Sequence, residues 1–164
     1  MDYGFRISEG GDNLKLAEAL LLRADLQKRI EQIKSRLKNN IMVQEGEASS
    51  EEPEDLLKEF LSSQKELATI IKRINKTNNT TLYNEEWTLS DVLVERDILL
   101  DKRSVLASSV ERASFRHDRY SKTEIKYVST INVKEIQKEV DKLSKQYREL
   151  DTKIQGLNWS TDLI

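Results

Sequence analysis

The residues best suited to chemistry lie between Arg119 and Thr130, a stretch rich in hydroxyl, tyrosine and basic side chains. Arginine and lysine bind phosphate oxygens, and a tyrosine ring can stack on a base. Ser129 and Thr130 directly precede an expected helix start, where free backbone N–H groups favour anions. The cluster predicts a surface for a small anionic, nucleotide-like ligand. The alternative is a polar strand followed by an ordinary helix cap.

Three further arginines, Arg23, Arg96 and Arg103, fall on the apolar seams of expected helices. A buried charge is costly unless it is paired, so one interpretation pairs these arginines across helices with Glu18, Asp25, Asp97 or Asp101. The other interpretation is that their guanidinium groups converge on an anionic ligand, which they can bind with two parallel hydrogen bonds.

Polar residues near the helix ends complete the predicted ligand-binding set. Asn75 and Asn78 can hydrogen-bond the polar edge of a ligand, or they simply end a helix, because asparagine competes for backbone hydrogen bonds. The full set is Arg23, Gln27, Asn75, Asn78, Arg96, Arg103, Arg119, Tyr120, Ser121, Lys126, Ser129 and Thr130.

Composition argues against several classes of function. The chain has no cysteine, and its one histidine, His117, lacks partners for general-base catalysis. No glycine-rich phosphate loop is present, and residue spacing nominates no catalytic residue, metal site or cofactor. With 27 basic and 29 acidic residues, the chain is not expected to bind nucleic acid. No apolar run is long enough to span a membrane and no signal sequence is recognisable, so we expect a cytoplasmic protein without a membrane partner.

The rest of the chain predicts the scaffold that positions these residues. The 164 residues are 34% charged and 37% hydrophobic, which fits long helices with narrow apolar seams that complete their burial by homo-oligomerisation. We expect an N-terminal arm, residues 1–12, and one helical domain, residues 13–164. The expected fold class is mainly α, with four helices at about 13–39, 53–78, 89–114 and 132–155, arranged as a bundle or as paired helical hairpins. One or two short β-strands are expected from residues 3–7, 82–87 and 125–131.

Local signals refine the helix boundaries. Pro53 suits a first helical turn, and Gly156 suits a left-handed helix end with Trp159 anchoring the tail that follows. Gln44 to Gly46 read as a turn, or alternatively as a lid. Asn39 and Asn40 are expected to stop the first helix, residues 41–53 to form a solvated connection, and Thr88 with Asp91 to cap the third helix.

Each helix has a predicted apolar seam. The seam of the first helix is Ala19, Arg23, Leu26, Ile30, Ile33 and Leu37, and that of the second is Leu57, Phe60, Gln64, Leu67, Ile71, Ile74 and Asn78. The seam of the third helix is Leu89, Val92, Arg96, Leu99, Arg103, Leu106 and Val110, and that of the fourth is Val133, Ile136, Val140, Leu143, Tyr147, Leu150 and Ile154.

The sequence also resembles the septicolysin-like family of bacterial and phage proteins. The residues that carry the resemblance are 16–20, 23–29, 43–47, 74–78, 88–89, 96–97, 119–121, 124–130, 149–151, 154–155 and 158–159. Together they cover nearly the whole chain after Asn13. The resemblance implies a helical fold, and the family name implies a pore-forming cytolysin.

From these observations we expect a non-enzymatic oligomeric protein that captures a small anionic, nucleotide-like ligand. Some small phage proteins sequester the nucleotide signals of bacterial immunity, and by that analogy the protein would be an anti-defence sponge, acting in the host cytoplasm if a phage encodes it. The alternatives are a structural or protein-interaction helical module, a pore-forming cytolysin, and a metal-dependent hydrolase that uses carboxylates.

Overall fold

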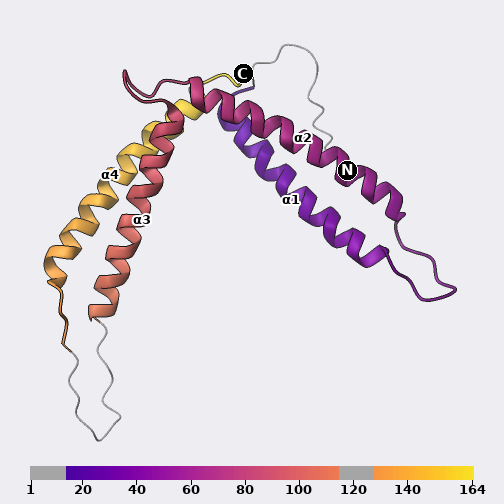
Figure 1. The fold of residues 1–164 in the computed structure, drawn as a ribbon, viewed down its shortest axis with the longest axis horizontal. Coiled ribbons are helices and arrows are strands. Elements are labelled where there is room, and N and C mark those ends of the chain that lie inside the picture. The colour runs from indigo at the N-terminus through magenta and orange to yellow at the C-terminus, as the bar shows by residue number, and fades with distance from the viewer. Residues whose placement is uncertain (1–13, 115–127) are drawn as a thin grey trace, which may run out of the picture. The chain divides into compact units, whose positions relative to one another are not determined.

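The chain is mainly α-helical, as predicted. A computed structural model describes residues 14–114 and 128–164, and the described residues form four helices (Figure 1). They are α1 (Leu16–Asn40), α2 (Pro53–Thr80), α3 (Leu89–Ser114) and α4 (Val133–Ser160). The predicted helices therefore all exist, and each boundary but one lies within three residues of its predicted position. The described residues contain no β-strand; the residues in isolated β-bridges are Lys15, which pairs antiparallel with Asp162, and Leu82 and Thr88 at the two ends of the turn before α3.

The chain divides into two units, which are described separately. Unit 1 runs up to Leu82 and also includes the C-terminal residues Leu157–Ile164. Unit 2 is Tyr83–Gly156. The first unit contains the α1–α2 helical hairpin and the second contains α3 with most of α4.

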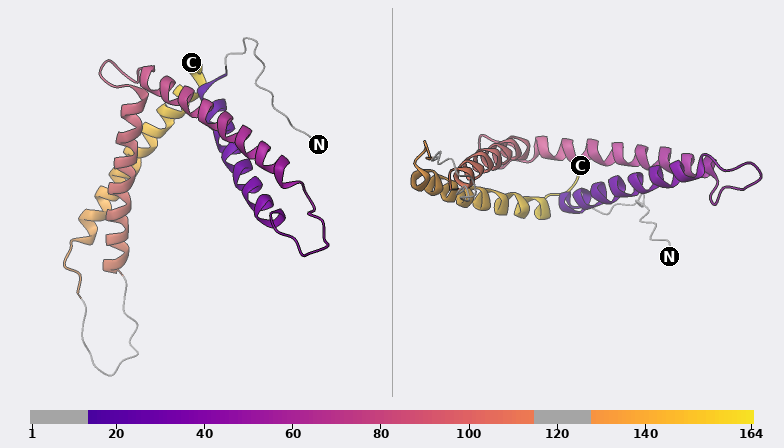
Figure 2. Two further views of the ribbon diagram at one scale, coloured as in Figure 1. Left: turned by 45° about the vertical axis from the view of Figure 1, so that its right-hand side comes forward. Right: turned by 90° about the horizontal axis from the view of Figure 1, so that it is seen from below.

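Unit 1 is built on α1 and α2, which lie side by side in every view (Figure 2). The predicted seam of α1 is confirmed, because the residues buried along it include Ala19, Leu26, Ile30 and Ile33. Pro53 occupies the first turn of α2, as predicted. There its missing N–H has no intrahelical partner to lose. The buried apolar residues of the pair are Leu16, Ala17, Ala19, Leu26, Ile30, Ile33, Leu56, Ile70 and Ile74.

The predicted seam of α2 is wrong at every second position. Phe60, Leu67 and Ile74 do lie inward, but the other buried residues are Leu56, Ser63, Ile70 and Thr77 rather than their C-terminal neighbours. The physical reason is that the observed seam and the predicted seam would bury different polar side chains. Thr77 satisfies its hydroxyl by donating to the Arg73 carbonyl at 2.9 Å, whereas the predicted seam would bury the larger amides of Gln64 and Asn78.

The end of α4 and the C-terminal tail also differ from the prediction. The helix does not end at Gly156 but continues to Ser160, and the single left-handed glycine among the described residues is Gly46. Trp159 is 58% exposed and does not anchor the tail. The tail is held instead by the buried Leu163, whose N–H donates to the Leu14 carbonyl at 2.7 Å. Ile164 adds a backbone hydrogen bond to the Thr77 hydroxyl at 3.0 Å.

Unit 2 pairs α3 with α4. The seam predicted for both helices is confirmed, with Leu89, Val92, Val140, Leu143 and Ile154 buried. Thr88 and Asp91 form the predicted cap of α3, in which the Thr88 N–H and hydroxyl both donate to Asp91 Oδ2, at 2.8 and 2.6 Å. This box fixes where the helix begins.

The predicted β-strands are not present in the described residues. Residues 82–88 form a turn in which the Tyr83 N–H donates to the Trp87 carbonyl at 2.8 Å, and the Asn84 side chain accepts from two backbone N–H groups. Residues 128–132 are irregular, with Ser129 hydrogen-bonded to Ile131. The expected strand at residues 3–7 and the first part of that at 125–131 lie outside the described residues.

Candidate functional site

The residues predicted to bind a ligand are divided between the two units. Arg23, Gln27, Asn75 and Asn78 belong to unit 1. Arg96, Arg103, Ser129 and Thr130 belong to unit 2. Arg119, Tyr120, Ser121 and Lys126 lie outside the described residues.

The seam arginines of unit 2 bind groups of their own unit. Arg96 donates through Nε and Nη2 to Asp97 Oδ1, at 3.1 and 2.9 Å, and its Nη1 lies 3.7 Å from Asp151 Oδ1. Arg103 donates through Nε to the Ser144 hydroxyl at 2.9 Å, and Ser144 in turn donates to the Val140 carbonyl. Asp97 was among the expected partners, but it lies on the same helix as Arg96; the partner across helices is Asp151, which was not expected. These contacts explain why α3 tolerates arginine on its seam.

The candidate residues of unit 1 do not form a cluster of contacts. Gln27 and Asn75 are exposed, and Arg23 is half-buried on the α1 seam. The buried Nε of Arg23 has no hydrogen-bond acceptor among residues 14–114 and 128–164. Asn78 does not end α2, which continues to Thr80. Ser129 and Thr130 are exposed, and Ser129 hydrogen-bonds within its own turn.

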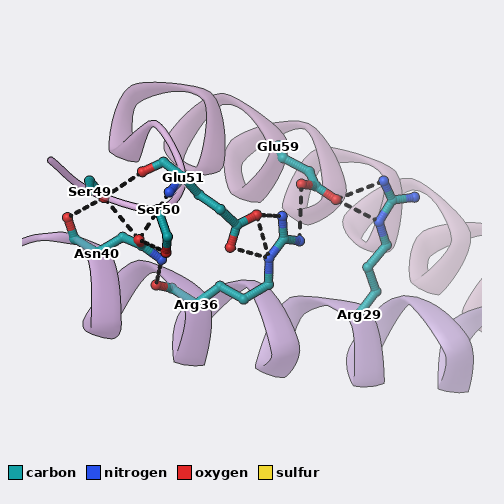
Figure 3. Close-up of polar contacts among 7 residues, drawn as sticks. All are labelled: Arg29, Arg36, Asn40, Ser49, Ser50, Glu51 and Glu59. Atoms are coloured by element: carbon teal, nitrogen blue, oxygen red, sulfur yellow. Dashed lines mark hydrogen bonds and ion pairs between the residues drawn. The ribbon is translucent and has the colours of Figure 1, made fainter.

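A different polar cluster stands out where α1 ends and α2 begins (Figure 3). Its centre is Asn40, the last residue of α1, which is only 6% exposed. Asn40 Oδ1 accepts from the Ser50 hydroxyl at 2.8 Å and from the Glu51 N–H at 3.1 Å, while Nδ2 donates to the Arg36 carbonyl at 2.9 Å. One buried side chain therefore ties the end of α1 to the residues that lead into α2.

Ser49 adds a second tie between the ends of the loop. Its hydroxyl lies within hydrogen-bond distance of Asn40 Oδ1 (2.8 Å), the Asn40 carbonyl (3.2 Å) and the Glu51 carbonyl (2.6 Å). A hydroxyl has one proton, so only one of these acceptors is served at a time. All three acceptors belong to Asn40 or Glu51, so the Ser49 hydroxyl lies between the two ends of the loop.

Charged groups extend this cluster along the α1–α2 pair (Figure 3). Arg36 donates to Glu51 through Nε and Nη2, and its Nη1 lies 3.6 Å from Glu59. Arg29 donates to the same Glu59 at 2.8 Å. The hydrogen bond from Arg36 lowers the pKa of the Glu51 carboxyl below its usual value and raises the pKa of the guanidinium. We call residues 36–51, from Arg36 through the loop to Glu51, the clamped loop.

The clamp holds in place a loop tip with exposed apolar side chains. Ile41, Met42 and Val43 are 62%, 85% and 49% exposed. The chain then turns at Gly46, whose φ of 93° is strained for other residues, and the Glu47 N–H closes the turn on the Gln44 carbonyl at 3.0 Å. The turn predicted here is confirmed. The lid stays a hypothesis.

Sequence reasoning missed this site because it treated residues 41–52 as a solvated connection. Two signals were available in the sequence. Three consecutive apolar residues, Ile41 to Val43, follow the end of a helix and have no helix or strand of their own to join. Twelve residues is also longer than most connections between antiparallel helices, which take about two to eight.

Residues 14–114 and 128–164 contain no group of three or more histidine, aspartate or glutamate side chains placed to hold a metal ion. None of the four helices is long and apolar enough to cross a membrane in the part of the chain that is described.

Comparison with known proteins places the chain in a group without an assigned activity. Residues 23–163 match DUF6847, described as a family of unknown function. A crystal structure of a functionally unknown conserved protein from Corynebacterium diphtheriae shares 40% sequence identity and superposes with a TM-score of 0.88. The match covers 93% of this chain and 100% of that one. No curated protein matches the chain.

Proposed function

This chain belongs to the DUF6847 family, whose function is unknown, and we propose from its own geometry that it is a non-catalytic protein-interaction module. In this proposal the clamped loop is the surface that contacts the partner protein. This is the protein-interaction alternative from the sequence analysis, and it replaces the capture of a nucleotide-like ligand as the leading hypothesis.

The observation that carries the proposal is a loop that is tied together at its base by hydrogen bonds and exposes apolar side chains. A connection between two helices does not require a buried asparagine. Asn40 is nevertheless buried, and its side-chain oxygen accepts hydrogen bonds from Ser50 and from the Glu51 N–H. Ordering a flexible loop on binding reduces affinity, and a loop that is already ordered avoids this loss. Met42 is left 85% exposed at the tip, where a partner can bury it.

The charges around the loop tip define the chemistry of the partner. Glu45 and Glu47 lie in the loop, and Glu52, Glu54 and Asp55 follow at the start of α2, all of them exposed. The nearest exposed bases are Lys38, in the last turn of α1, and Lys58, which lies 3.0 Å from Asp55, so acids still outnumber bases around the loop. The complementary surface is therefore an apolar pocket with basic residues on its rim, since interfaces place opposite charges around an apolar centre.

The other hypotheses from the sequence stay predictions. Capture of a nucleotide-like ligand depends in part on Arg119, Tyr120, Ser121 and Lys126, which are not described, and the described arginines of unit 2 are bonded within that unit. The cytolysin and hydrolase alternatives, the septicolysin-like resemblance, the phage role as a sponge, the cytoplasmic location and homo-oligomerisation are likewise untested expectations.

Site-specific photo-crosslinking in cells tests the proposal. A photoreactive amino acid at Met42 is expected to yield a discrete crosslinked protein, whereas the same amino acid at the exposed Lys65 of α2 should not. The crosslinked protein is then purified and its affinity is measured against wild type and Val43→Ser. We expect a loss of about tenfold or more, because a buried apolar anchor contributes roughly 1.5 kcal/mol or more.

Two results would contradict the proposal. One is an identical crosslinking pattern at Met42 and Lys65, which would mean that the loop has no specific contact. The other is an unchanged affinity in Val43→Ser with an intact far-ultraviolet circular dichroism spectrum. Native mass spectrometry of the purified protein tests the alternative of ligand capture. A bound nucleotide mass that is lost in Arg119→Ala and in Lys126→Ala would favour that alternative.

A further inference from the structure

Helix α3 has apolar side chains on two opposite sides. Its seam toward α4 includes the fully buried Leu89 and Val92. Val94, Ile98 and Val105 are instead 57%, 40% and 57% exposed. At about 100° per residue these three lie within roughly 40° of one another and more than 100° from the centre of the seam. We call them the outer stripe of α3; Figure 1 shows the helix that carries it.

An apolar stripe on the outside of a helix is the mark of a surface that another helix covers. Helices of soluble proteins ordinarily place polar residues opposite their buried face. The spacing of four and seven residues in the outer stripe is that of positions that meet a partner helix every second turn. The stripe belongs to unit 2, so it is separate from the clamped loop of unit 1.

The charges beside the stripe identify the kind of helix that fits it. Over residues 91–112 the exposed charged residues on that side are four acids and two bases, and Asp101 lies in line with the stripe, between Ile98 and Val105. The acids are Asp91, Glu95, Asp97 and Asp101, and the bases are Lys102 and Arg112. Arg96 lies on the seam, where its Nη1 is 3.7 Å from Asp151, and it also donates to Asp97 at 2.9 Å. The acids of the rim that have no ion pair among the described residues are therefore Asp91, Glu95 and Asp101. An acidic rim around an apolar stripe complements a helix with an apolar face and basic flanks.

A second copy of α3 fits this rim poorly. In an antiparallel pair of helices, each flank of one helix meets the same flank of its partner. A pair centred on the stripe would therefore place Asp97 of each copy against Asp101 of the other. In a parallel pair in register, Asp101 would face its own counterpart across the seam. Like charges opposed in this way destabilise the pair.

We infer that the outer stripe of α3 binds an amphipathic helix of a different protein, with lysine or arginine on both flanks of its apolar face. The inference is independent of the proposed function, because it uses no residue of the clamped loop. A protein with both surfaces would connect two partners.

Two synthetic amphipathic peptides with the same leucine stripe, one with lysine flanks and one with glutamate flanks, test the inference on the full-length protein. Fluorescence anisotropy is expected to show at least about tenfold tighter binding of the lysine-flanked peptide at low salt, since acids outnumber bases beside the stripe. Raising the salt concentration should reduce this difference.

Substitutions locate the binding on the outer stripe. Ile98→Ser with Val105→Ser is expected to weaken the lysine-flanked peptide about tenfold or more, because both side chains are exposed anchors whose loss leaves the fold intact. The matched control, Leu57→Ser with Leu61→Ser in α2, should bind like wild type. Glu95→Gln with Asp101→Asn should reduce the preference for lysine flanks.

Three results would overturn the inference. Equal affinity for the two peptides would exclude the role of the acidic rim. Unchanged binding in the Ile98/Val105 variant would place the peptide elsewhere. A concentration-dependent dimer in sedimentation analysis that the same variant dissociates would show that a second copy covers the stripe.

Discussion

Replacing Asn40 by alanine tests whether the clamped loop is ordered by one buried side chain. The substitution removes three hydrogen bonds, those from Ser50 and from the Glu51 N–H and that to the Arg36 carbonyl. It also removes one of the three acceptors within reach of the Ser49 hydroxyl, which keeps the other two. At about 1 kcal/mol each, their loss amounts to roughly 3 kcal/mol. Water can reach part of this cluster, because Ser50 is exposed, so we expect about 2–3 kcal/mol.

Two measurements separate loss of the clamp from general destabilisation. The Glu51 amide should exchange its proton with solvent about 30- to 150-fold faster, because each 1.4 kcal/mol is a factor of ten. Thermal unfolding should shift down by roughly 5–10 °C if the loop opens only with the whole unit. Faster exchange without a thermal shift would mean that the loop opens locally.

Asn39→Ala is the matched control for this experiment. Asn39 is the preceding residue of α1 and is exposed, so its replacement should change the free energy of unfolding by no more than about 0.5 kcal/mol. The reasoning about the clamp is refuted if Asn40→Ala and Asn39→Ala have the same stability and the same Glu51 exchange rate.

Three further perturbations have defined outcomes. Because the pKa of Glu51 is lowered from 4.5 in the folded state, its ion pair contributes stability above about pH 5 and loses it as pH falls through the lowered pKa; Glu51→Gln should remove this part of the acid dependence in a pH series of thermal melts. Ile70→Ala should cost about 2–5 kcal/mol in urea unfolding and the adjacent Ile71→Ala clearly less, and equal costs would contradict the corrected seam of α2. Thr88→Ala removes the cap of α3 and should lower the free energy of unfolding by about 1 kcal/mol, whereas Thr88→Ser should retain most of it.

The amino-acid pattern was sufficient for the helices and for three of the four seams. Periodicity is a property of neighbouring residues, so it can be read without knowing what the helix packs against. The seams of α1, α3 and α4 follow it. In α2 the adjacent pairs Leu56–Leu57 and Ile70–Ile71 allow two seams one residue apart, and only packing against α1 selects the first residue of each pair.

The partners of the seam arginines, in contrast, could not be predicted from the spacing of residues in the sequence. That Arg96 lies on a seam was evident from spacing, but its partners Asp97 and Asp151 come from both helices of unit 2. Arg103 similarly meets Ser144, which is 41 residues away in the chain. An arginine that binds a ligand and one that binds its neighbours have the same sequence pattern, because the difference lies in which groups the fold brings within about 3 Å.

What the sequence by itself determined was the set of helices, their approximate ends and the cap at Thr88, since these depend on interactions between residues three or four apart. Only the tertiary structure decided the conformation and contacts of residues 36–51. Asn40 was expected to stop a helix, and it does stand at the end of α1, but its burial depends on Ser49, Ser50 and Glu51 returning across a twelve-residue loop. Contacts over such a separation form only when α1 and α2 pack, and the exposure of Met42 follows from the same closure.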